Sequence, residues 1–139
     1  MNTKVLIVDD HKMFRDGLRG LINAEPDMEV VGEATGGRQA IELTQQLMPE
    51  VVIMDINMPN MDGIQATQAI HSEFPDINVI GFSLLEESIY RDAMKHAGAV
   101  TNVDKTGPSE ELISAIRGCL RPPILDAVSM RPAGPARIS

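Results

Sequence analysis

Four apolar, strand-like runs of this chain each lead into a side chain that could take part in phosphoryl transfer. The runs and the polar residues at their ends are Val5–Val8 before Asp9 and Asp10, Val51–Met54 before Asp55, Val79–Phe82 before Ser83, and a weaker run around Val100–Val103 just before Lys105. In an open parallel sheet the carboxyl ends of all strands lie at one edge, where ligands bind. Three carboxylates, a hydroxyl and an ammonium would meet there, which suits a magnesium-assisted site for phosphorylating an aspartate.

The three carboxylates favour a bound cation, because like charges held close together repel one another. A site of carboxylate oxygens that keeps some waters and awaits a phosphate suits Mg²⁺ better than zinc or calcium. Taken alone, Asp9 and Asp10 would more often cap the next helix, and Asp55 would be a turn-forming acid. A turn does not explain an acid at the end of a buried strand, so the joint pattern favours a metal site. His11, His71 and His96 lack ligand spacing and are expected at the surface.

Asp55 is the predicted nucleophile, because a carboxylate can attack phosphorus and form an acyl phosphate. The transferred group chiefly needs positioning and charge neutralisation. Ser83, one strand away, could donate a hydrogen bond to a phosphoryl oxygen, and Lys105 would place a compact cation opposite the acids. Each of these two residues alone would be an ordinary strand end or surface lysine, and only the combination indicates a site.

The composition excludes several classes of protein. The chain has 139 residues and a net charge of -8, which argues against a nucleic-acid or anionic-membrane surface. Cys119 is the only cysteine, so no intrachain disulfide can form and a reducing compartment is expected. The sequence has no signal peptide and no run of about 18 apolar residues that could span a membrane. These observations predict a cytoplasmic protein.

Strand-like and helix-like segments alternate from residue 4 to residue 120, which predicts five βα units around a parallel sheet. The segment Met28–Ala34 has Glu29 and Glu33 on one predicted face, as in a half-exposed edge strand. The apolar residues expected on its other face are Met28, Val30 and Ala34. With this strand at an edge, the predicted fold class is an α/β, flavodoxin-like doubly wound sandwich with strand order 2-1-3-4-5.

Apolar stripes at helical spacing predict a helix after each strand. The stripes are Phe14, Leu18, Leu21 and Ile22; Ala40, Leu43 and Leu47; Ile64, Thr67 and Ile70; Ile89, Ala93 and Ala97; and Leu112, Ile116 and Leu120. Ser109 is expected to cap the last helix with its hydroxyl. Residues 121–139 contain four prolines and no stripe, so a domain at 1–120 followed by a disordered tail is predicted.

Three segments resemble the receiver domain of response regulators from bacterial two-component systems. They are the opening VLIVDDHKMFRDGLRGLI, the loop MDINMPNMDG, and the element from Gly98-Ala99 to Lys105. The likeness spans about residues 3–120, and jointly the motifs are highly specific. The DDH opening and EPDMEVVGEATGGRQAIEL are most similar to the NarL/FixJ (LuxR-type) subfamily, whose members usually carry a C-terminal helix-turn-helix. Whether this receiver stands alone or belongs to a longer regulator stays open.

The resemblance implies that Asp55 accepts a phosphoryl group from a phosphohistidine of a sensor histidine kinase. It implies that Asp10 and Asp55 bind Mg²⁺ directly, together with the backbone carbonyl of Asn57, and that Asp9 assists. Lys105 would pair with the acids and then with the phosphate.

The family pattern also implies a switch. Ser83 would be the switch hydroxyl, while Pro59 and Gly63 would shape the loop that bears Asn57. A homodimer formed on phosphorylation is a further expectation, with control of transcription where a helix-turn-helix is present. No turnover of an external substrate is expected.

Two departures from the family pattern concern this switch. Thr101-Asn102 stands where family members commonly have glycine and then an aromatic residue, which normally turns inward when the switch hydroxyl moves. Leu84 follows Ser83 where many receivers have a small residue, and it would restrict access to Asp55. We therefore expect a smaller conformational response than in receivers with the aromatic residue.

Two alternatives stay open at this point. The chain could be a binding module that no longer switches, in which case partners would be indifferent to Asp55→Asn. It could instead be a Mg²⁺-dependent hydrolase that works through an aspartyl phosphate. Such enzymes commonly place a second acid two residues after the nucleophile, where this chain has Asn57.

Overall fold

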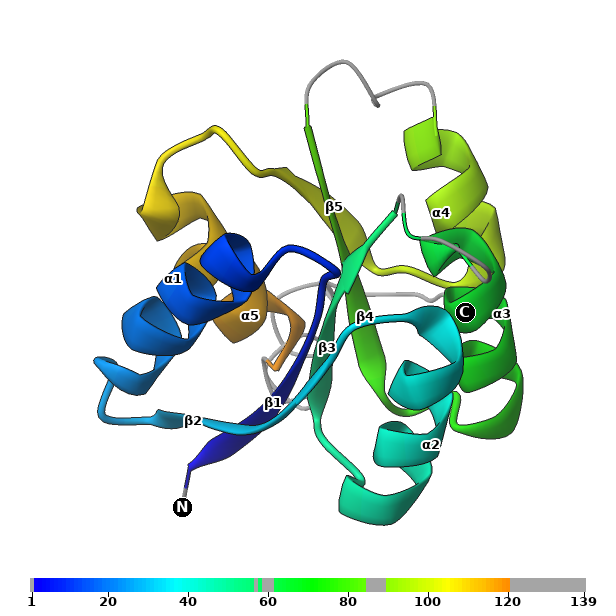
Figure 1. The fold of residues 1–139 in the computed structure, drawn as a ribbon, viewed down its shortest axis with the longest axis horizontal. Helices are drawn as coiled ribbons and strands as arrows, with labels where there is room; N and C mark the ends of the chain where they lie inside the picture. Colours follow the sequence, from blue (N-terminus) through cyan, green and yellow to red (C-terminus); the bar gives the residue numbers. More distant parts are fainter. Residues whose placement is uncertain (1, 57, 59–61, 85–89, 121–139) are drawn as a thin grey trace, which may run out of the picture.

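A computed structural model describes residues 2–56, 58, 62–84 and 90–120 and shows one parallel sheet between two layers of helices (Figure 1). The strands are β1 (Thr3–Val8), β2 (Met28–Ala34), β3 (Val51–Asp55), β4 (Asn78–Ser83) and β5 (Thr101–Asp104). The helices are α1 (Lys12–Asn23), α2 (Gly37–Leu47), α3 (Gly63–Glu73), α4 (Arg91–Ala97) and α5 (Ser109–Cys119). The order β2-β1-β3-β4-β5 confirms the predicted doubly wound α/β fold.

Some predictions fall on residues that the structure does not describe. These are the tail at 121–139, the loop residues Asn57 and Pro59, and Ile89 of the fourth helical stripe. Among the described residues, no helix is long and apolar enough to cross a bilayer.

Two hydrophobic cores lie on opposite faces of the sheet (Figure 1). Helices α1 and α5 cover one face, where Val5 and Ile7 of β1 point, and helices α2, α3 and α4 cover the other, where Leu6 and Val8 point. All four of these β1 side chains are essentially inaccessible to solvent. Fully burying an aliphatic side chain is worth about 1.5–3 kcal/mol, so the central strands are firmly held between the helix layers.

The edge strand β2 contains a bulge that the alternation of its sequence did not reveal. Val5 pairs with Val30, but Leu6 pairs with Gly32, so Val31 is an extra residue in the register. One extra residue reverses which face the following side chains occupy. Met28 therefore packs with the α1–α5 core and Ala34 with the opposite core. The prediction that these two residues share a face was wrong.

The start of α5 also differs from expectation. Ser109 is the first residue of the helix rather than its cap, and the N-cap residue is Pro108, which makes no side-chain capping bond. Glu110 and Glu111 do lie in the first turn, where their charges complement the helix dipole. At the end of α4, Gly98 adopts a φ of 121°, a backbone conformation that favours glycine.

The last two strands meet around an unusually tight contact. Gly81 of β4 pairs with Asn102 of β5. A Cβ atom on Gly81 would overlap with Oδ1 of Asn102 and come within 3.2 Å of Cε of Met94. The absence of a side chain at residue 81 is therefore what admits the Asn102 carboxamide between β4 and α4.

We predict that Gly81→Ala lowers the free energy of unfolding by about 1–3 kcal/mol, because the added methyl group overpacks this contact. In a protein that also carries Asn102→Ala, the same substitution should lower the free energy of unfolding much less. Urea denaturation of the four proteins in this cycle measures the coupling.

Gly20→Ala is the matched control, since nothing lies within 4 Å of its added methyl group. This control should raise the stability by roughly 0.5–1 kcal/mol, as expected for an exposed helical glycine. If Gly81→Ala lowered the free energy of unfolding by the same amount with Asn102 as with alanine at residue 102, the packing interpretation would be contradicted.

Candidate functional site

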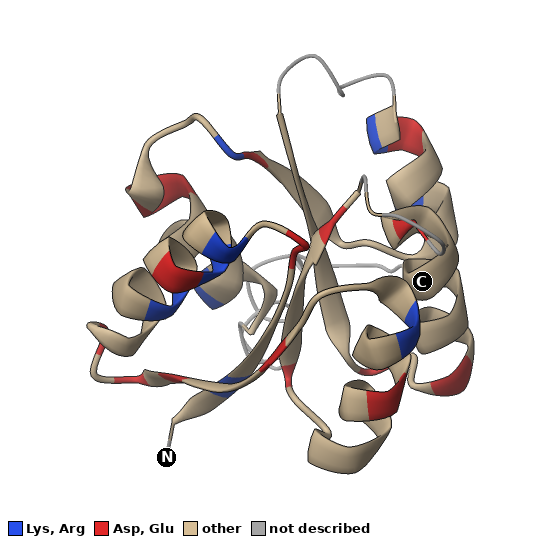
Figure 2. Ribbon diagram, in the orientation of Figure 1, with Lys and Arg blue, Asp and Glu red and all other residues tan. Residues whose placement is uncertain are grey.

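The carboxyl ends of the strands bring together charged residues that are far apart in the sequence. Figure 2 shows acidic segments where β1 and β3 end and a basic segment just beyond β5. Asp9 follows β1 and Asp55 ends β3, and both are buried. Ser83 ends β4 and is also buried, and the side chain of Lys105, just beyond β5, is only 3% exposed. The predicted set of residues therefore does lie at one edge of the sheet.

Lys105 is the cation that joins these strands. Its Nζ lies 2.8 Å from Oδ2 of Asp9 and 3.2 Å from Oδ1 of Asp55. Burial alone would lower the pKa of this ammonium, but the hydrogen bond to Asp9 and the charges of both carboxylates outweigh burial and raise the pKa above its usual value. The side chain is therefore held protonated between the two acids.

The backbone of Lys105 is hydrogen-bonded to the end of β4. Its N–H donates to the carbonyl oxygen of Ser83 at 2.8 Å. This bond continues the β4–β5 pairing beyond Asp104, and from there the lysine side chain reaches the ends of β3 and β1. A displacement of Ser83 would consequently move Lys105 as well.

The acids form a cluster around the ammonium. Asp9, Asp10, His11 and Asp55 each offer a ligand atom, and these atoms all lie within 4.8 Å of one another. Nδ1 of His11 is 3.1 Å from an oxygen of Asp9 and 3.1 Å from an oxygen of Asp10. Three carboxylates and one ammonium leave an excess of two negative charges, which a divalent cation would neutralise.

The carboxylate ligands of this cluster suit Mg²⁺ better than zinc or calcium. Two of the acids are buried and Asp10 is 28% exposed, so the cluster is partly open to water. Mg²⁺ prefers a few carboxylates together with retained waters, which matches such a site. His11 is 61% exposed, as expected for a surface residue, but the sequence did not predict its contact with the acids.

Helix α1 fixes the position of Asp9. The backbone N–H of His11 donates to Oδ1 of Asp9 at 2.8 Å, and Nη1 of Arg15 donates to the Asp9 carbonyl oxygen at 2.8 Å. Arg15 is itself held 3.4 Å from Glu33 of β2. Arg15 was not predicted to contribute to the site, and its helical spacing after the acid pair is the only sequence signal that could have found it.

The segment after β3 is held close to the acid. The N–H of Gly63 donates to the carbonyl oxygen of Ile56 at 2.8 Å, and a Cβ atom at residue 63 would lie 2.8 Å from Cα of Ile56 and overlap with the Asp55 carbonyl oxygen. Asp62 caps α3 in a reciprocal pair of bonds with Gln65. Only a glycine lets α3 begin this close to the end of β3.

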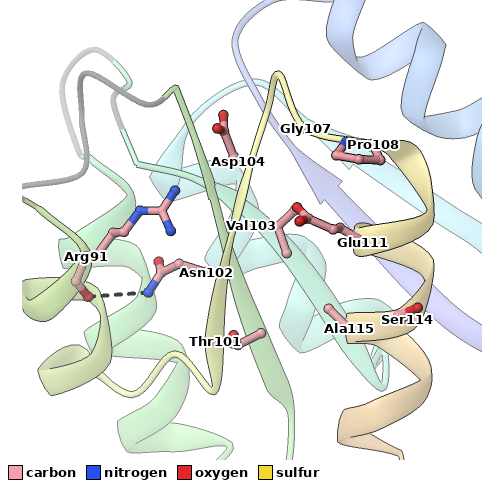
Figure 3. A pocket seen from close by; sticks show the side chains of 10 residues that line it. All are labelled: Arg91, Thr101, Asn102, Val103, Asp104, Gly107, Pro108, Glu111, Ser114 and Ala115. Atoms are coloured by element: carbon pink, nitrogen blue, oxygen red, sulfur yellow. Dashed lines mark hydrogen bonds between the residues drawn. The ribbon is translucent and has the colours of Figure 1, made fainter.

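Two buried polar atoms near β4 and β5 lack hydrogen-bond partners among the described residues. They are Oγ of Ser83 and Oδ1 of Asn102. Figure 3 shows Asn102 directed toward Arg91 at the start of α4, where its Nδ2 donates to the Arg91 carbonyl oxygen at 3.4 Å. The same side chains line a cavity of about 830 Å³ beside β5. The position expected to carry an aromatic ring is thus occupied by a partly satisfied carboxamide.

Comparison with known proteins agrees with this geometry. Residues 5–117 match the response regulator receiver domain, so the chain belongs to that family. The transcriptional regulatory protein LiaR of Bacillus subtilis is 39% identical over 116 residues, covering 82% of this chain and 54% of LiaR. The response regulator VraR of Staphylococcus aureus is 35% identical over 119 residues, covering 84% of this chain and 56% of VraR.

Solved structures show the same fold. The response regulator domain of Thermotoga maritima CheB has a TM-score of 0.79 at 35% identity, covering 86% of this chain and 96% of that domain. A DNA-binding LuxR-family response regulator from Staphylococcus aureus has a TM-score of 0.78 at 28% identity, covering 84% of this chain and 98% of that structure. These relatives support the NarL/LuxR-like subfamily. The chain spans about half the length of the curated relatives it matches.

We predict that Mg²⁺ raises the unfolding temperature of this protein, because the cation relieves repulsion that exists only when the acids are brought together. At a concentration 100 times its Kd, the ion should add about 2.7 kcal/mol. Asp10→Asn should raise the stability of the metal-free protein and shrink the gain from Mg²⁺. Thermal unfolding with and without Mg²⁺, at matched ionic strength, measures both effects.

Asp76→Asn is the control for this experiment. It removes an exposed acid just before β4, at the amino ends of the strands and therefore away from the acid cluster. Mg²⁺ should raise the unfolding temperature of this variant as much as that of the wild type. If Mg²⁺ raised the unfolding temperature of Asp10→Asn as much as that of the wild type, the ion would not bind at the predicted cluster.

Proposed function

We propose that this receiver domain accepts a phosphoryl group on Asp55 from a phosphohistidine of a sensor histidine kinase, with Mg²⁺ at the acid cluster. The observation that most supports the proposal is the shared contact of Lys105 Nζ with Asp9 and Asp55. A lysine held charged and nearly inaccessible beside a buried acid is suited to neutralise a phosphoryl group on that acid.

The chemistry assigns a task to each residue. A carboxylate oxygen of Asp55 forms the new bond to phosphorus while the bond from phosphorus to the histidine nitrogen breaks. Mg²⁺, held by Asp10 and Asp55 with the Asn57 carbonyl and with help from Asp9, would supply positive charge at the phosphoryl oxygens. Lys105 keeps its ammonium at the acceptor carboxylate, and Ser83 offers a hydroxyl that can donate to a phosphoryl oxygen.

The proposed output is a conformational change in the β4–α4–β5 region. The phosphoryl group carries about -1.5 to -2 charges in place of the single charge of the Asp55 carboxylate, and its oxygens would draw the Ser83 hydroxyl toward them. Because the Ser83 carbonyl oxygen accepts a hydrogen bond from the Lys105 N–H, this movement would reach the end of β5. Dimer formation and the control of transcription by a longer protein are part of this proposal, and they rest on the resemblance to full-length regulators.

The proposal is tested by incubating the protein with a small phosphodonor and Mg²⁺ and measuring the intact mass. We expect the wild type to gain one phosphoryl group and Asp55→Asn to gain none. The purified kinase domain of a cognate sensor is the second donor, because Leu84 is expected to hinder small donors at the site. A gain of mass by Asp55→Asn, or no gain by the wild type with either donor, would refute the assignment.

The residue at position 102 motivates a prediction about the size of the response. Since Asn102 has no ring to bury, we expect a phosphoryl mimic to cause smaller chemical-shift changes in residues 83–105 than in receivers with an aromatic residue there. Amide NMR spectra with and without the mimic and Mg²⁺ provide the measurement. A response as large as that of the aromatic receivers would show that Asn102 does not limit the switch.

This measurement also bears on the second candidate function, a binding module that does not switch. Asn102 in place of the aromatic residue is the observation that favours it. Such a module would show no spectral change beyond the immediate neighbours of the mimic. Its partner would then bind wild type and Asp55→Asn equally well.

A further inference from the structure

The ammonium of Lys105 has aromatic neighbours as well as acidic ones. Its Nζ lies 4.5 Å from the ring centroid of Phe14 on α1 and 5.8 Å from that of Phe82 on β4. Both distances are within the range in which a cation is attracted to the face of a ring. The lysine therefore lies between two carboxylates and two aromatic rings.

Phe14 offers the ammonium an interaction beyond those with the two acids. An ammonium has three N–H donors, and the two carboxylate contacts of Lys105 involve one oxygen each from Asp9 and Asp55. The lysine side chain is 3% exposed, so water has little access to the ammonium. The nearest aromatic face is that of Phe14, and cation–π attraction is strongest where the cation is desolvated.

The ring of Phe14 is itself held in place by edge contacts. It packs against Phe82 at a centroid distance of 6.4 Å and an angle of 87°, and against His11 at 6.0 Å and 77°. Phe14 also borders a cavity of about 310 Å³ between α1 and the start of α5, which Lys105 lines as well. Because Phe14 is only partly buried and adjoins this space, its substitution should disturb packing less than a change in the centre of a core.

We propose that Phe14 is a positioning residue whose ring face holds the Lys105 ammonium between Asp9 and Asp55. The inference rests on the proposed function, since the lysine acts there on the phosphoryl group. The quadrupole of the ring is what matters, so an apolar side chain of similar bulk cannot replace it. Phe14 acts only through Lys105 and does not itself contact the reacting atoms.

The first test needs neither metal nor phosphate. NMR of the wild type should show the ε-methylene protons of Lys105 shifted upfield by the ring current of Phe14. In Phe14→Leu most of this shift should disappear, leaving the part due to the more distant Phe82, whereas Phe14→Tyr should retain it. Unchanged lysine shifts in Phe14→Leu would overturn the proposal.

The second test measures phosphorylation at saturating donor and Mg²⁺. We expect Phe14→Leu to reduce the maximal rate roughly three- to tenfold, with the donor concentration for half-maximal rate little changed. Phe14→Tyr should restore the rate to within about twofold, since it keeps the ring. Equal impairment of the tyrosine and leucine variants would show that shape alone matters and would also overturn the proposal.

Two further variants keep the tests decisive. Phe74→Leu makes the same substitution in a phenylalanine that packs on the opposite core, and it should leave the lysine shifts and the rate unchanged. Phe14→Met replaces the leucine variant if that protein does not fold, because it fills similar space without a ring. If the wild type is not phosphorylated, the proposed function fails, whereas the lysine shifts still decide the role of Phe14.

Discussion

The architecture of the site depends on one buried ammonium that is shared by two buried carboxylates. Separating Lys105 from Asp9 and Asp55 would leave charges unpaired at the centre of the molecule, which is far costlier than losing an exposed ion pair. The Lys105 N–H donates to Ser83 while its ammonium contacts Asp9 and Asp55, so the ends of β5, β4, β3 and β1 are joined through this residue. The same arrangement concentrates acid in excess of base, and this excess is what makes a divalent cation favourable there.

Buried polar side chains occur both in the acid cluster and around β4, β5 and α4. Oγ of Ser83, Oδ1 of Asn102 and Nε of Arg91 are buried without hydrogen-bond partners among the described residues. A buried polar atom that stays without any partner costs about 1–3 kcal/mol relative to a satisfied one. The apolar residues of β4, β5 and α4 belong to the same two hydrophobic cores as the rest of the sheet. Under the proposed function, a change in charge at Asp55 would act first on the polar atoms of this region. In this chain β5 contains Asn102, whose Nδ2 donates to the Arg91 carbonyl oxygen of α4, where an aromatic residue would instead bury a ring.

Particular residues show how far the sequence could predict this structure. Continuous apolar runs identified the buried strands, and the exposed face of Met28–Ala34 correctly placed β2 at the edge of the sheet. The predicted faces of the β2 side chains were nevertheless wrong beyond Val31. A bulge there changes the alternation, and no distinctive residue type marks it in the sequence. The contacts of Arg15 with Asp9 and of Phe14 with Lys105 were also not predicted. Both lie on α1, and their value to the site depends on how that helix packs over the sheet.

The order of residues along the chain by itself determined which side chains end the parallel strands. Because such ends share one edge, the gathering of acids, hydroxyl and lysine followed from periodicity alone. Only the tertiary structure decided that Lys105 contacts Asp9 and Asp55 together and rests against Phe14, and that Asn102 fits beside a glycine. These contacts depend on separations of a few ångströms between distant segments. Helix packing and strand register set such separations, and neither is encoded in the spacing of residue types.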